Sequence, residues 1–385
     1  MGNGKNQIKA ESLGRNEVDH RRRLVRGVGV ALVMGAMALG AHTIPGIGSY
    51  IVLATQETPP QAAAPPVGLT PAQERLLSLA PAADLLALVD LRRVFGETLP
   101  LLGERKIGGL DTIAGSLGAI TLATGVAPAN AREGVLALSL QGLQAGGLLL
   151  VGGIDLDLAK LEPLLRANQM TFRRETRGGF DLLTLQTPVA PVTLGPLVLS
   201  TEELTVAPLG DQRLAIGNLP AVVALVEGMS KAALATAATP DSPLLGALRQ
   251  TRAAALIRFG VRLPEGLREE IATQGDLFRS LSKVETIRGE IDLARSLELT
   301  LEARFPTPDP KEAAELNLGL KGLLNLARAL FGSVGEPAAA GRTSLNQVLD
   351  QIRFAVQGSE VSLRLALPAA FLEGMSRPAP AASRS

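Results

Sequence analysis

The spacing of hydrophobic positions is clearest in the last third of the chain. Apolar side chains alternate there with polar ones over nine residues: Leu297, Leu299, Leu301, Ala303 and Phe305 against Glu298, Thr300, Glu302 and Arg304. This period of two predicts a strand with one buried face and one face in water, which is typical of an antiparallel sheet. The segment Val284 to Leu293 is its expected antiparallel partner.

The residues that follow change to a helical spacing. One face of a helix from Lys311 to Phe331 would carry Leu316, Leu320, Leu323, Leu324, Ala327 and Phe331. After it, Ile352 to Gln357 and Glu360 to Leu367 read as a hairpin across Gly358-Ser359.

Similar elements are expected earlier in the chain. We predict helices at 94–102, 158–167, 220–230 and 264–273, and strands at 85–91, 119–124, 134–140, 148–154, 170–175, 180–186, 204–207, 213–217 and 253–261. The order strand, helix, two strands, helix, strand, Pro-led helix occurs twice. We therefore predict an α+β fold with a tandem repeat of an antiparallel sheet-plus-helices unit. The repeats would span 70–230 and 252–376, with a connector at 231–251.

A different pattern precedes the first repeat. Arg21, Arg22, Arg23 and Arg26 are followed by no charged residue until Glu57. Crossing about 30 Å of hydrocarbon takes roughly 20 helical residues, and Leu24 to Ile44 meets that length. We predict an N-terminal transmembrane anchor at 21–55.

The arginines orient this anchor. They would keep the N-terminus on the cytoplasmic side of a bacterial inner membrane and place the rest of the chain on the other side. The chain's one tyrosine, Tyr50, would lie at the outer interface. A cleaved signal peptide is the alternative; the 26 residues before the apolar core favour an uncleaved anchor.

Three further segments complete the domain plan. Residues 1–20 are polar and aperiodic, so we expect a disordered cytoplasmic tail. The Pro- and Ala-rich stretch 56–69 predicts a stiff linker, and 377–385 predicts a second disordered tail.

This layout, from about Thr70 to Met375, resembles that of uncharacterised bacterial proteins with one N-terminal membrane helix and a duplicated exported α+β domain. The resemblance rests on the order of elements. It implies the same fold and location and brings no particular activity with it.

Composition excludes several functions. Residues 1–26 carry +4 (seven Lys and Arg against three acids), whereas the whole chain carries +1. The remainder is therefore near −3 and shows no basic run for nucleic acid. The chain has no Cys, and its two His, His20 and His42, both lie at the anchor. The exported part therefore lacks the groups for Ser-His-Asp, Cys-His and His-ligated zinc chemistry.

Two weak motifs remain. Ser280 and Lys283 match S-x-x-K without its companion elements, so an ordinary helix end is favoured. Asp155 and Asp157 share a face where a cation could bind, but the spacing lacks the calcium-loop Gly, so a helix cap is favoured. We assign no catalytic, cofactor or metal residues and expect no enzyme and no cofactor.

The sequence thus favours a non-catalytic, membrane-anchored module of the cell envelope that binds an envelope protein. The alternative is a carrier or scaffold for a lipid or other apolar ligand. The apolar strands at 135–140 and 148–154 could line its pocket, although a sheet covered on both faces is the preferred interpretation.

Overall fold

The fold is described from a computed structural model over residues 67–104, 127–141, 144–167, 169–186, 192–194, 197–199, 203–232, 242–273, 275–333 and 345–369. Arg21, Arg22, Arg23, Arg26 and Tyr50 lie outside this range, as do both tails, the whole 21–55 segment, most of the linker and the strand expected at 119–124. Among the described residues, no helix combines the length and apolar character needed to span a bilayer.

Helices and strands are interspersed along the described chain. The helices are α2 (Pro71–Leu77), α3 (Leu91–Arg93), α4 (Leu99–Glu104), α6 (Leu158–Ala167), α7 (Leu219–Ala232), α8 (Pro243–Arg249), α9 (Glu265–Thr273), α10 (Asp276–Ser282), α11 (Pro310–Ser333) and α12 (Leu345–Asp350). A π-helical turn, Val94–Thr98, joins α3 to α4, and a 3-10 turn covers Pro128–Asn130. The strands are β1 (Leu85–Asp90), β2 (Glu133–Gln141), β3 (Gln144–Gly152), β4 (Phe172–Arg177), β5 (Phe180–Leu185), β6 (Val192–Leu194), β7 (Leu197–Leu199), β8 (Leu204–Gly210), β9 (Arg213–Asn218), β10 (Ile257–Arg262), β11 (Thr286–Leu293), β12 (Leu299–Pro306), β13 (Arg353–Gln357) and β14 (Glu360–Leu367).

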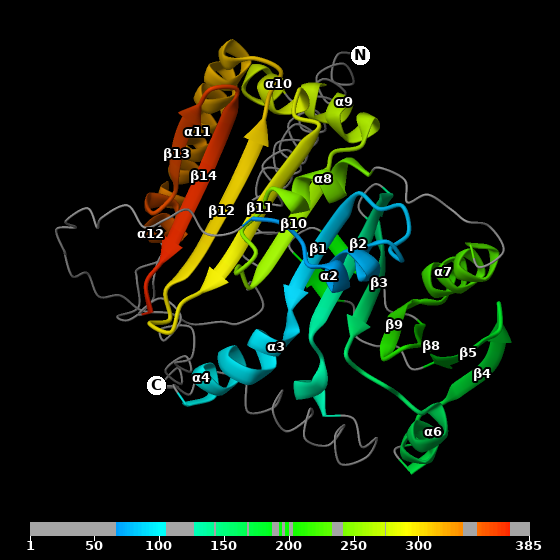
Figure 1. Cartoon of the computed structure of the whole chain (residues 1–385). Helices are drawn as coiled ribbons and strands as arrows, with labels where there is room; N and C mark the ends of the chain where they lie inside the picture. The colour runs from blue at the N-terminus through cyan, green and yellow to red at the C-terminus, as the bar shows by residue number, and fades with distance from the viewer. Residues whose placement is uncertain are drawn as a thin grey trace, which may run out of the picture.

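All fourteen described strands belong to one large sheet, which confirms the α+β class. Its main path runs β13-β14-β12-β11-β10-β1-β2-β3-β9-β8-β5-β4 (Figure 1). The pairings between described strands are antiparallel except for the short contact of β3 with β7. Among the described strands, β13 and β4 are the outermost strands of this path.

The two halves of the sequence meet in the middle of this sheet, where β1 pairs with β10. Ala87 lies opposite Phe259, and the backbone bonds from Asp90 N to Leu256 O and from Arg262 N to Asp84 O extend the ladder at its two ends. Ion pairs reinforce the junction: Arg262 with Asp84 at 2.9 Å and Arg93 with Asp292 at 2.7 Å.

The central strands are covered on both faces, as the sequence analysis preferred. On one face Val135, Leu148 and Leu150 join a core with α2, α7 and α8. On the other face Leu138 and Val151 enter two further cores. The strands at 135–140 and 148–154 are therefore packed within the sheet.

Beyond the junction, buried and more exposed side chains alternate along β12. Ala303 and Phe305 of β12 share a core with the long helix α11 and its neighbours α9 and α10, and Leu301 packs in a second core with Val348 of α12. In Figure 1, α11 lies behind β12 and β14. The pairing of β11 with β12, the hairpin of β13 with β14, and α11 are confirmed as predicted.

Two details differ from the sequence prediction. The strand expected from residue 253 begins at Ile257, because Arg252 to Ala255 form a turn closed by Ala255 N and Arg252 O. The strand expected at 148–154 begins earlier, at Gln144, so Gly146 and Gly147 lie inside β3.

Candidate interaction surface

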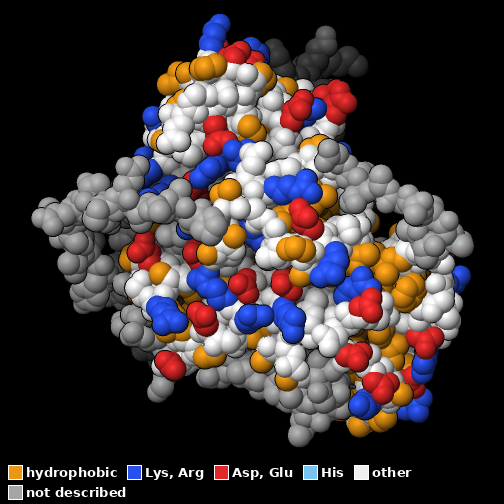
Figure 2. Space-filling view, viewed as in Figure 1, with side chains coloured by type: hydrophobic (Ala, Val, Ile, Leu, Met, Phe, Trp, Pro, Cys, Tyr) orange, Lys and Arg blue, Asp and Glu red, His pale blue; other side chains and the backbone are white. Residues whose placement is uncertain are grey.

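The described strands of the second half present a charged side opposite α11. We call it the polar face and define it by Arg258 on β10, Arg288, Glu290 and Asp292 on β11, Glu302 and Arg304 on β12, and Arg364 on β14. These residues share one side because their strands are paired in register and side chains alternate. Figure 2 shows acidic and basic side chains mixed over this side of the molecule.

Like charges lie directly opposite one another on the polar face. Arg288 is the cross-strand partner of Arg304, and Glu290 is the partner of Glu302. Like charges in direct opposition destabilise a strand pair. Opposite charges lie on the other side of the two glutamates: Arg258 is the second cross-strand partner of Glu290, and Arg364 is that of Glu302. The polar face is thus a patch of mixed charge and a candidate for a role in binding.

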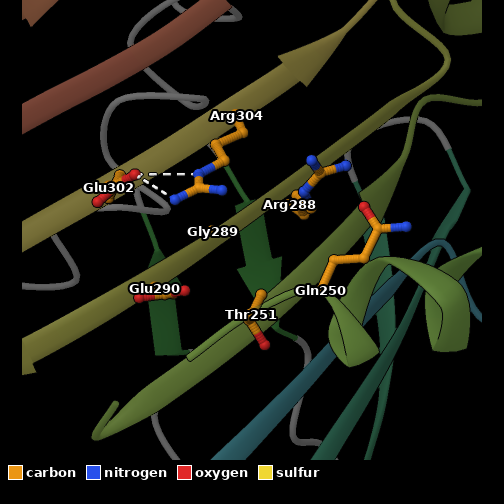
Figure 3. A pocket seen from close by; sticks show the side chains of 7 residues that line it. All are labelled: Gln250, Thr251, Arg288, Gly289, Glu290, Glu302 and Arg304. Atoms are coloured by element: carbon orange, nitrogen blue, oxygen red, sulfur yellow. Dashed lines mark hydrogen bonds and ion pairs between the residues drawn. The ribbon is translucent and has the colours of Figure 1, made fainter. Parts of the chain in front are cut away.

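Ion pairs with neighbouring carboxylates hold the two opposed arginines in place. Arg304 donates from Nε and Nη2 to Glu302 Oε1 at 3.0 and 2.8 Å (Figure 3). Arg288 is paired with Glu360, and Arg304 Nε lies 4.0 Å from the same carboxylate. Burial works against the charge of Arg304, but the bond to Glu302 and the nearby carboxylates outweigh it, so its pKa is raised.

Toward the junction the polar face becomes buried. Arg258 is 2% exposed and donates to Gly68 O at 2.6 Å and to Gln73 Oε1 at 2.7 Å. Burial lowers the pKa of Arg258, and the charges of Glu290 and Asp90 oppose that effect. Glu290, 4% exposed, is paired with Arg252 and also accepts its backbone N–H at 2.6 Å.

A shallow hollow lies between these groups. Its walls are Gln250, Thr251, Arg288, Gly289, Glu290, Glu302 and Arg304 (Figure 3). It encloses about 170 Å³, part of which is open solvent. The hollow is therefore a surface depression and not an enclosed pocket of the kind that holds a small molecule.

Within the described part of the sheet, α8 packs on β10 and β11 from this side, and α2 covers Arg258 of β10. Among the described elements, β12 has its main contacts with the neighbouring strands β11 and β14. The polar face is therefore open over β12 and β14, as far as the described residues go.

The two weak motifs have structural roles. Asp157 Oδ1 accepts the N–H of Ala159 at 2.9 Å at the start of α6, which is the predicted cap. Lys283 follows α10 and contacts Glu312 at 3.2 Å and Glu315 at 3.4 Å, which raise its pKa. A raised pKa keeps the ammonium protonated, whereas a general base must lose that proton. The described residues contain no group of acidic side chains suited to a metal ion.

Sequence reasoning assigned Glu302 to a wet face but missed the rest of this surface. The alternation at 297–305 placed Glu302 and Arg304 on one side, and the expected pairing with 284–293 could have brought Arg288 and Glu290 beside them. Sequence alone did not give the register that opposes like charges.

Comparisons with known proteins add little. No family model matches the chain, and no curated protein does. Solved structures of TP0453 are similar: crystal form I aligns at 9% identity with a TM-score of 0.40, covering 78% of this chain and 95% of that chain. Crystal form III gives 10% identity, a TM-score of 0.39 and coverages of 78% and 97%. At this level of similarity the alignments carry no argument.

Proposed function

We propose that the chain is a single-pass, membrane-anchored protein whose exported α+β domain binds another protein of the cell envelope through the polar face. The observation that carries this proposal is the opposition of Arg288 to Arg304 and of Glu290 to Glu302 on a sheet face that is open over the described parts of β12 and β14. Proteins depart from local stability rules chiefly at functional sites. A partner with its own alternating charges would meet Glu302, Arg304 and Arg364, whereas Glu290 is buried and already paired with Arg252.

Catalysis is not part of this proposal. The exported sequence contains no Cys or His, and Lys283 is held in its protonated form by Glu312 and Glu315. The hollow on the polar face is a surface depression and offers no enclosed space for a substrate.

The location proposed here rests on the sequence. Arg21, Arg22, Arg23 and Arg26 precede an uncharged stretch long enough to cross a bilayer. A reporter enzyme that is active only outside the cytoplasm, fused after residue 385, is expected to be active. Replacing the four arginines with glutamate should lower that activity, and unchanged activity would argue against this topology.

We also propose that the exported domain arose by duplication of one unit. α2 starts at Pro71 and β1 follows fourteen residues later at Leu85; α8 starts at Pro243 and β10 follows fourteen residues later at Ile257. Outward from the junction, the order β1-β2-β3-β9-β8 is matched by β10-β11-β12-β14-β13. These correspondences support the repeat, with the β4–β5 hairpin as an insertion in the first unit.

Site-specific photo-crosslinking in intact cells tests the proposed binding surface. A photoreactive residue at Arg364, which is exposed on the polar face, should give one discrete protein adduct. The same residue at Leu318, which is 70% exposed on α11 at the opposite side, is the control and should not give that adduct.

A charge-swapped variant sharpens this test. Exchanging the pair, Glu302→Arg with Arg304→Glu, keeps an ion pair on β12 but reverses the pattern that a partner meets. The adduct at Arg364 should fall at least tenfold while the folded content stays the same. An adduct that survives the swap unchanged would show that the polar face is not the binding surface.

The carrier alternative makes a different prediction. A carrier would hold an apolar ligand inside the protein, but the described parts of β2 and β3 are filled on both faces. Mass spectrometry of an organic extract of the chain purified without detergent is expected to show no stoichiometric lipid. Finding one would favour the carrier.

A further inference from the structure

The hairpin of β13 and β14 leaves one strand at the end of the described sheet. Among described strands, β13 pairs with β14 alone. Gln357 and Glu360 close the two-residue turn as a hydrogen-bonded pair, and Gly358 has a φ of 59° that such a turn requires. Because hydrogen-bonded positions alternate, Ala355 and Arg353 face β14, whereas the backbone groups of Phe354 and Val356 point outward.

This outer strand lacks the protection that sheet ends usually carry. Proteins guard an end strand with charged side chains, proline or a bulge. β13 has one charge, Arg353, and its remaining residues are Phe354, Ala355, Val356 and Gln357. Val356 is 39% exposed and is one of the few large apolar side chains exposed in the described structure.

The opposite end of the sheet shows the contrast. β4 carries four charges, Arg173, Arg174, Glu175 and Arg177. If β4 paired with a copy of itself, its two most overlapped registers would bring Arg174 against Arg174 or Arg173 against Arg177. The β4 end is therefore protected against self-pairing.

The sequence of β13 is complementary to itself in antiparallel pairing. A register centred on Ala355 overlaps all five residues and sets Phe354 opposite Val356 and Arg353 opposite Gln357. No like charges meet, and the aromatic–β-branched pair is a favourable cross-strand combination. The outward backbone groups of Phe354 and Val356 then meet in two pairs that exchange two hydrogen bonds each, four in all.

We infer that two copies of this chain associate through β13, forming a continuous sheet across a two-fold axis at Ala355. This association does not use the polar face, so it goes beyond the function proposed above. A five-residue strand gives a small contact compared with the roughly 1,600 Å² of a standard interface. The pairing is therefore expected to be weak and concentration-dependent.

Disulfide trapping in the full chain tests this inference, because the chain has no cysteine of its own. Ala355 would lie opposite its copy in a non-hydrogen-bonded pair, with a Cα separation of about 4.5 Å. That distance suits a disulfide, which needs roughly 4.4–6.8 Å. Ala355→Cys should give a covalent dimer on oxidation of the purified protein at micromolar concentration, read on a non-reducing gel and by intact mass.

A matched variant controls for random collision. Gln357→Cys is equally exposed on the same strand, but in the proposed register the two Gln357 positions are four residues, about 14 Å, apart. Its dimer yield should be at least tenfold lower than that of Ala355→Cys. Equal yields from the two variants would overturn the proposed register.

A second variant tests the side-chain pairing. Val356→Lys in the Ala355→Cys chain places a charge opposite Phe354 of the copy and should lower the dimer yield at least tenfold. Its circular dichroism and unfolding midpoint should stay close to those of the parent, since Val356 is exposed. An unchanged dimer yield would overturn self-association through β13.

Discussion

Arg258 offers the sharpest test of how the start of the folded domain is attached to the sheet. Its guanidinium is buried on β10 and donates to Gly68 O and Gln73 Oε1. Gln73 Oε1 also accepts the N–H of Thr70 at 3.0 Å, so the cap of α2 and the buried arginine share one acceptor. Replacing Arg258 with methionine keeps most of the apolar stem and removes both hydrogen bonds.

The expected cost follows from these contacts. Hydrogen bonds to a charged group contribute about 1.5–3 kcal/mol each, so two give an upper range of about 3–6 kcal/mol. Methionine needs no desolvation of a charge, and this recovers part of that energy. Glu290 keeps its pairing with Arg252, so no carboxylate is left buried alone. We expect a net loss of about 2–3 kcal/mol.

The assay is urea unfolding of the full chain, together with limited trypsin cleavage at Arg75 in α2. Arg258→Met should lower the unfolding free energy and speed cleavage at Arg75, because α2 loses its contact with β10. Arg258→Lys is the control: it retains the charge and can reach one acceptor, so its loss should be smaller. A loss below about 0.5 kcal/mol for Arg258→Met, or equal losses for both variants, would refute this reasoning.

Other predictions concern single positions in the described fold. Gly289→Ala places a Cβ 2.3 Å from Phe259 Cζ and 2.5 Å from Glu302 O, so it should destabilise by about 1–3 kcal/mol in urea unfolding, whereas Gly246→Ala, which meets no atom within 4 Å in α8, should be neutral or stabilising by up to about 1 kcal/mol. The hydrogen bond from Arg174 lowers the pKa of Asp181 below 3.8, so its contribution is present above that pH and lost as the pH falls through the lowered value. Asp181→Asn should therefore change stability at pH 7 more than at pH 2, and a difference independent of pH would contradict this assignment. Asp157→Ala should cost about 1 kcal/mol by removing the cap of α6, and Asp157→Asn less than that; equal losses would argue against a cap.

Local patterns predicted the elements of the second half well. The alternation from Leu297 to Phe305 and the Gly358-Ser359 turn each determine a local structure within a few residues, so β12 and the last hairpin follow directly from sequence. The same holds for α11, whose apolar stripe packs on the sheet through Leu316 and Leu320.

Pairing between strands that are far apart in the sequence could not be predicted from these local patterns. β1 and β10 join halves of the chain that are far apart in sequence, and no local signal specifies that contact. The alternation Ile257-Arg258-Phe259 indicates a strand with Arg258 in water, yet α2 covers this arginine and buries it. The opposition of Arg288 to Arg304 depends on the register of β11 with β12, which periodicity alone leaves undetermined.

The entry point of the chain has a mechanical consequence if the N-terminus is anchored as proposed. Gly68 is bonded to Thr251 O and to Arg258, and Val67 forms a bridge with Arg252, so the linker joins the sheet at its centre. Tension from the membrane would load the junction of β1 and β10 first. The outer strands β4 and β13 lie far from this entry point in the sheet order, so they would be loaded only through whatever holds the domain against the membrane.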